Sequence, residues 1–138
     1  MDAKALDFWL GEWDCAWDGG HGTNSITREL DDAVVVERFE ARAPEAFRGM
    51  SVSVYDEHAG WRQTWVDSNG SYWHLVGAPL GDGSPSFRTP TPVDDEHVFK
   101  RMVFSNVERD RFDWRWESSP TGDAWHERWA IRYTRRSA

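Results

Sequence analysis

Aromatic and charged side chains alternate over six residues, Phe112-Asp113-Trp114-Arg115-Trp116-Glu117. A second run does nearly the same, Trp125-His126-Glu127-Arg128-Trp129-Ala130-Ile131-Arg132-Tyr133. A period of two is typical of a β-strand with one buried and one solvated face. We therefore expect two strands whose inner faces carry Phe112, Trp114, Trp116, Trp125, Glu127, Trp129, Ile131 and Tyr133.

Turn-forming residues divide the rest of the chain at regular intervals, and β-branched and aromatic residues fill the segments between them. This spacing is typical of an antiparallel meander. Asn69-Gly70 predicts a tight type I′ hairpin, because both central residues of that turn need positive φ. A short helix is expected over Asp2–Leu10, and a long proline-containing loop over Gly81–Glu96. The expected strands are 12–18, 22–30, 33–42, 49–55, 61–67, 71–77, 97–106, 111–118 and 125–134, with a short one possible near 86–89.

The apolar faces of these strands can be buried in two ways. A single sheet can close into a barrel, or two sheets can stack as a sandwich. A Greek-key sandwich needs long crossovers, whereas consecutive hairpins pair neighbours and bring the last strand back to the first. We therefore predict an all-β fold, an up-and-down antiparallel barrel of about 8–10 strands with a short N-terminal helix.

Composition limits the class of protein. The 138 residues predict a single domain, 1–138. The net charge of −8 argues against nucleic-acid binding, and no apolar run is long enough for a membrane span. The lone Cys15 and the absence of an apolar leader predict a cytoplasmic protein. Ten tryptophans are more than one small core ordinarily needs, so some are expected to contact a ligand.

Gly11-Glu12-Trp13, placed after a short helix at the start of the first strand, resembles the Gly-x-Trp signature of the calycins, which include lipocalins and fatty-acid-binding proteins. The resemblance implies that Trp13 plugs one end of the barrel. It also implies that a basic residue from the last strand covers its ring; Arg135 or Arg136 is suited to this, with Arg132 as the other option. The wider pattern resembles bacterial calycin-like families of unknown function and, more distantly, the haem-binding nitrobindins.

A barrel of this size encloses side chains or one small ligand. The expected ligand contacts are tryptophans and tyrosine on inner faces, together with polar groups that orient the ligand: Glu37, Gln63, Trp65, Arg101, Trp114, Trp116, Trp129 and Tyr133. The alternative is that the inward aromatic residues only fill a solid core.

Three residues are candidates for catalysis: Glu37, Asp67 and His74. An inward Glu37 could act as a general acid or base, or form a structural pair with Arg28 or Arg101. Asp67 either faces the cavity or caps the turn that follows it. His74 lies mid-strand and is either functional or structural. The five histidines show no metal-ligand spacing, so no metal site is predicted.

Four functions follow from this interpretation. The first is binding of a small, mainly hydrophobic or aromatic molecule, without a cofactor. The second is a cofactor-free isomerase or cyclase that uses an inward carboxylate. The third is haem binding, which the resemblance to nitrobindins implies and which the position of the nearest late histidine, His126, does not favour. The fourth is an interaction protein with a solid core that assembles as a homodimer.

Overall fold

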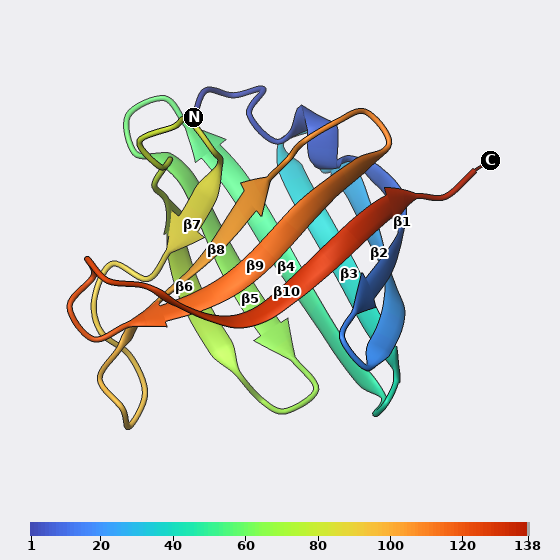
Figure 1. Ribbon diagram of the computed structural model, residues 1–138. Helices are drawn as coiled ribbons and strands as arrows, with labels where there is room; N and C mark the ends of the chain where they lie inside the picture. The colour runs from blue at the N-terminus through green and yellow to red at the C-terminus, as the bar shows by residue number, and fades with distance from the viewer. Residues whose placement is uncertain (138) are drawn as a thin grey trace.

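The computed structural model describes residues 1–137 and forms one closed barrel of ten antiparallel strands (Figure 1). Each strand pairs with its neighbours in sequence, and β1 pairs with β10 to close the sheet. This arrangement confirms the predicted up-and-down barrel, and the sandwich is wrong. The strands are β1 (Gly11–Trp17), β2 (Gly20–Glu29), β3 (Val34–Ala43), β4 (Phe47–Asp56), β5 (Gly60–Asp67), β6 (Tyr72–Gly77), β7 (Ser86–Arg88), β8 (Phe99–Ser105), β9 (Arg111–Ser119) and β10 (His126–Arg135).

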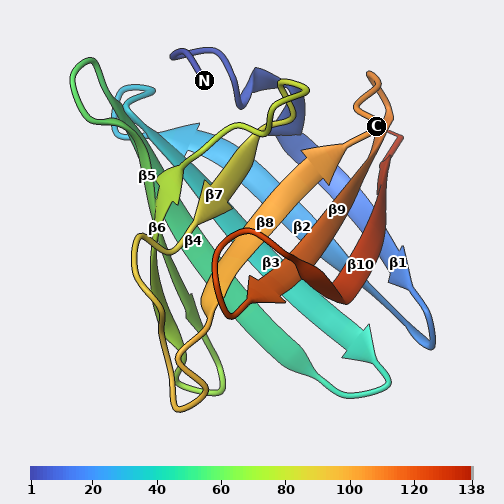
Figure 2. The same cartoon turned by 60° about the vertical axis from the view of Figure 1, so that its left-hand side comes forward.

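The N-terminal segment covers one end of the barrel. It contains a single 3-10 turn, η1 (Asp7–Trp9), which is shorter than the predicted helix. Figure 1 shows this turn at the end of the barrel opposite the β5–β6 hairpin, and Figure 2 shows it again above the strands. Trp61 fixes the start of the segment, because its Nε1 donates to the Asp2 carbonyl at 2.7 Å. No helix within residues 1–137 is long and apolar enough to cross a membrane.

Trp13 closes this end of the barrel, as the resemblance implies. It is fully buried, and its Nε1 donates to the carbonyl of Trp9 at 2.8 Å. The guanidinium of Arg135 lies 4.2 Å from the centre of the indole ring, a cation–π contact. Arg135 also donates to the Leu10 carbonyl at 2.8 Å. The side chain that covers Trp13 is therefore Arg135, on the strand paired directly with it.

The turn between β5 and β6 is wider than predicted. The Gly70 amide donates to the Asp67 carbonyl at 2.9 Å, and Gly70 has φ of +79°, whereas Asn69 does not have positive φ. The Asp67 carboxylate also accepts hydrogen bonds from the amides of Asn69 and Ser71. These contacts hold a four-residue connection, so the prediction of a two-residue type I′ turn is wrong.

β10 contains a bulge that changes the face of its first residues. The register with β9 shifts between Glu127 and Trp129, which leaves Arg128 as an extra residue. Trp129 pairs with Trp116 on the inner face, whereas Glu127 pairs with Glu117 on the outer face. The prediction that Trp125 and Glu127 point inward is therefore wrong. Trp125 instead lies on the outer wall, 4.1 Å from the guanidinium of Arg101.

Candidate functional site

A cavity of about 260 Å³ lies inside the barrel and extends to the end opposite η1. Its walls are mainly aromatic and aliphatic, with a few polar groups. Five of the ten tryptophans line it. The lining residues are Glu37, Phe39, Phe47, Gln63, Trp65, Asp67, Asn69, Ser71, Trp73, Leu75, Met102, Trp114, Trp116, Trp129, Ile131 and Tyr133.

Small residues on β4 leave room for the cavity. Alternation places Gly49, Ser51 and Ser53 at consecutive inward positions, opposite larger side chains of β5. The Trp65 indole lies directly over Gly49, where an added Cβ would come within 2.2 Å of two ring carbons. Gly49 therefore sets the position of one aromatic wall.

Gly49→Ala is expected to displace the Trp65 indole and change the shape of the cavity, because the added methyl group and the ring cannot occupy the same space. The ring is the far end of a side chain and can shift to make room. The tryptophan emission spectrum should therefore differ clearly from that of wild type, while the melting temperature changes little. Met50→Ala is the matched control on the outer face of β4. Equal fluorescence spectra of wild type and Gly49→Ala would contradict this account of Trp65.

Glu37 is the buried acidic group of the cavity. Its Oε2 accepts from Asn24 Nδ2 at 2.7 Å, and its Oε1 accepts from Ser51 Oγ at 2.8 Å. Burial raises the pKa of the Glu37 carboxyl, and the hydrogen bonds from Asn24 and Ser51 only partly oppose this. The predicted structural pair with Arg28 or Arg101 is wrong: Arg28 forms an ion pair with Asp7 near the N-terminal turn.

A chain of polar groups continues from Glu37 to the seam between β1 and β10. Asn24 Nδ2 also donates to the Tyr133 hydroxyl at 2.9 Å. The Tyr133 hydroxyl in turn contacts Cys15, and burial raises the pKa of both Tyr133 and Cys15. These two groups are therefore neutral at physiological pH, and Cys15 lacks the thiolate that a nucleophile needs.

Gln63 and Asp67 occupy different depths of the cavity. Gln63 is buried and donates from Nε2 to Ser53 Oγ at 2.9 Å, which leaves its amide oxygen as an acceptor. Asp67 lies at the β5–β6 turn, where it both lines the cavity and caps the turn. Partial burial acts to raise the pKa of Asp67, but hydrogen bonds from Trp65 Nε1 and two backbone amides outweigh it, so the pKa lies below its usual range.

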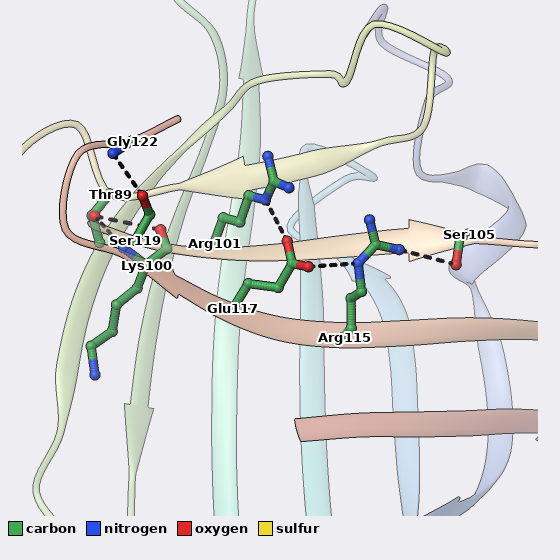
Figure 3. Close-up of polar contacts among 8 residues, drawn as sticks. All are labelled: Thr89, Lys100, Arg101, Ser105, Arg115, Glu117, Ser119 and Gly122. Carbon is green, nitrogen blue, oxygen red and sulfur yellow. Dashed lines mark hydrogen bonds and ion pairs between the residues drawn. The ribbon is translucent and has the colours of Figure 1, made fainter. Parts of the chain in front are cut away.

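Two predicted site residues lie outside the cavity. His74 is exposed on β6, where alternation turns it away from its inward neighbours Trp73 and Leu75. Arg101 is on the outer face of β8, where its Nε donates to Glu117 Oε1 at 2.6 Å (Figure 3). The prediction of Arg101 as a ligand contact is therefore wrong.

The partners of Arg101 explain its position. Figure 3 shows the Glu117 carboxylate between Arg101 and Arg115, whose Nε donates to it at 2.9 Å. Trp125 covers this group by packing on Arg101. Alternation places the charged side chains of β9 on the solvated face. Glu117 is one of them, yet it is only 7% exposed. An ion pair on the outer wall, partly shielded from solvent, holds Arg101 there.

The remaining predicted ligand contacts come together. Glu37, Gln63, Trp65, Trp114, Trp116, Trp129 and Tyr133 all line the one cavity. Sequence reasoning missed Trp73, Phe39 and Phe47, although the alternation of their strands contains the signal for an inward position. It also missed the hydrogen bonds of Asn24 and Ser51 with Glu37, which depend on the pairing of β2, β3 and β4.

Haem does not fit the residues of this cavity. No histidine is among the residues that line it in the described part of the chain, and His126 is exposed at the start of β10. Within residues 1–137, no group of three or more His, Cys, Asp or Glu side chains is placed to hold a metal ion. The proline-containing segment 81–96 contributes no lining residue either, contrary to the expectation that it borders the mouth.

Comparison with protein-family models and with curated protein sequences finds no match to this chain. The geometry of the cavity and the chemistry of its residues are therefore the basis for assigning a function.

Proposed function

We propose that this protein binds a small, mainly apolar or aromatic molecule inside its barrel. The observation that carries the proposal is the cavity of about 260 Å³ lined by five tryptophans, with Glu37 and Gln63 as buried polar groups. Ligand sites are typically apolar hollows with a small number of polar groups that orient the ligand. The cavity is slightly smaller than most sites for drug-sized molecules, which favours a compact ligand.

The exposure of the tryptophans favours a ligand-binding wall and disfavours the alternative of a solid core. Trp9, Trp13 and Trp61 are at most 3% exposed and fill the closed end of the barrel. The five cavity tryptophans are only partly buried, although they point inward. Their accessible surface faces the cavity, and covering it with a ligand would remove apolar area from water.

The closed barrel with Trp13 under Arg135 also supports the proposal that the chain is a calycin-like protein. The Gly11-Glu12-Trp13 start of β1 and the cation–π contact at the closed end agree with that resemblance. A calycin-like barrel is consistent with ligand binding but does not by itself specify a ligand, because function depends on the site.

The test is binding of N-phenyl-1-naphthylamine, a neutral probe whose fluorescence rises in apolar surroundings. We expect wild type to bind it and Ile131→Trp to lose at least about tenfold in affinity, because the larger side chain occupies part of the space that the probe needs. Ala130→Trp is the matched control, since Ala130 is exposed on the same strand. Circular dichroism checks that both variants fold. Equal binding by wild type and Ile131→Trp would place the probe elsewhere and overturn the proposal.

One observation favours a second function, a cofactor-free isomerase or cyclase. Glu37 lines an open cavity and has a raised pKa, which is a property of general acids and bases. Asp67 and His74 are less suited, because Asp67 has a lowered pKa and His74 points outward. In this case a substrate would turn over in wild type, and Glu37→Gln would bind it without turnover. Equal turnover by Glu37→Gln would exclude this role for Glu37.

Cytoplasmic location and homodimer formation stay predictions. The exposed Met50, Val66 and Tyr72 are neighbours on the outer face of β4, β5 and β6. Sedimentation velocity measures whether the protein dimerises. Fractionation of cells that produce it measures where it is located.

A further inference from the structure

We propose that the ligand of the cavity is an organic ammonium ion, a compact aromatic or aliphatic amine whose charged nitrogen binds at Glu37. This inference rests on the proposed function, because it requires that the cavity bind a small molecule. It adds the charge and chemical class of that molecule.

The charges of the lining favour a cation. Among the described residues that line the cavity there are two carboxylates, Glu37 and Asp67, and no lysine, arginine or histidine. Arg101, which could have supplied a positive charge, is paired with Glu117 on the outer wall. The net charge of the whole chain is −8, so the long-range field also attracts cations. The Lys100 ammonium lies 4.7 Å from the ring of Trp73, which lines the cavity, but it is paired with Asp94 at 2.9 Å. An anionic ligand such as a fatty acid would therefore meet two carboxylates and no unpaired cation among the described lining residues.

Glu37 lacks a counter-charge in the structure. Both groups that hydrogen-bond to it, the Asn24 amide and the Ser51 hydroxyl, are neutral. A buried carboxylate with no cationic partner is unfavourable in its charged form, which agrees with the raised pKa of this group. Two titratable groups that interact electrostatically with it, Cys15 and Tyr133, are neutral because burial raises the pKa of each. An ammonium ion would supply the missing positive charge.

The surroundings of Glu37 suit the rest of such a ligand. Phe39 follows Glu37 at the next inward position of β3, and Trp129 lies 5.7 Å from the Phe39 ring. Aromatic faces attract ammonium groups and also cover apolar carbon. The amide oxygen of Gln63 offers a second acceptor in the cavity. Aromatic surface and a second acceptor therefore line the same cavity as the Glu37 carboxylate.

The experiment compares three probes that share a phenyl ring and differ in charge: 2-phenylethylamine, 2-phenylethanol and phenylacetate. Their binding is measured by isothermal titration calorimetry with the full-length protein at pH 7.5. We expect the ammonium to bind about tenfold more tightly than the alcohol, because a charge-assisted hydrogen bond replaces a neutral one. Phenylacetate should bind most weakly.

Two variants locate the preference. Glu37→Gln keeps the shape of the side chain and removes its charge, so it should abolish the preference for 2-phenylethylamine over 2-phenylethanol. Glu40→Gln makes the same change of net charge on the exposed face of β3 and should leave the preference in place. A preference that Glu40→Gln removes as fully as Glu37→Gln does would reflect the overall charge and overturn the assignment to Glu37.

The outcomes separate this inference from the proposed function. If 2-phenylethanol binds as tightly as 2-phenylethylamine, and Ile131→Trp weakens both, the cavity binds ligands and the inference of a cation is wrong. If none of the three binds and N-phenyl-1-naphthylamine also fails to bind, the proposed function is wrong and the inference fails with it.

Discussion

Trp13→Ala is expected to lower the free energy of unfolding by about 3 to 5 kcal/mol, the range for removal of a large aromatic side chain from a core. Trp13 is 0% exposed and contacts the Phe112 and Tyr133 rings. Its loss also removes the surface under Arg135 and the hydrogen bond to the Trp9 carbonyl. Urea denaturation followed by circular dichroism measures the change.

Trp125→Ala is the matched control for this prediction. It makes the same substitution on the outer wall, where Trp125 packs against Arg101 and Arg88 but does not belong to the barrel interior. Its effect should be less than half as large. An equal loss of stability in both variants would show that closure of the barrel does not depend specifically on Trp13.

Glu37→Gln is expected to gain stability relative to wild type as the pH rises above the ordinary pKa of a carboxyl group. Burial raises the pKa of Glu37 in the folded protein, so the folded state binds this proton more tightly than the unfolded state does. The resulting stabilisation is complete below the unfolded pKa and is lost as the pH rises through the folded pKa. Between those two pKa values the unfolding free energy of wild type falls by about 1.4 kcal/mol per pH unit. The variant has no carboxyl group at this position, so its unfolding free energy does not fall for this reason.

The measurement is urea denaturation of wild type and Glu37→Gln at several pH values between roughly 4.5 and 8, the range above the ordinary pKa of a glutamate carboxyl. The difference in unfolding free energy should move in favour of the variant across that range. Asp67→Asn is a control of opposite sign: its lowered pKa stabilises wild type at neutral pH, and that contribution is lost only as the pH falls to acid values. A constant difference between wild type and Glu37→Gln would contradict burial of an unpaired carboxyl.

Local alternation was sufficient to predict most of the fold. The period of two in Phe112-Asp113-Trp114-Arg115-Trp116 places every second residue inward whatever the neighbouring strand is, so the inner faces of β9 and β5 could be read directly. The closing contact of Trp13 with Arg135 followed from a resemblance to known barrels and not from periodicity.

The errors have a physical cause in common: they depend on partners distant in sequence. The bulge at Arg128 interrupts the alternation of β10 and turns Trp125 and Glu127 outward, and only the register with β9 reveals it. The sequence made Arg101 a candidate partner of the inward Glu37, but Arg101 points outward from β8 and pairs with Glu117. Its choice of Glu117 follows from the direct pairing of β8 with β9.

The seam between β1 and β10 has a consequence for biosynthesis. Arg135 donates to the carbonyl of Leu10, 125 residues earlier in the chain, and the barrel cannot close until both strands are present. Contacts of such long sequence separation form slowly, because the loop-closure entropy must be overcome first. While the ribosome is still making the C-terminal strand, β1 lacks half of its hydrogen-bonding partners and the aromatic interior stays open to water. Newly made chains therefore pass through a stage in which apolar surface is exposed to water, and a nascent chain that stops before β10 cannot complete the barrel.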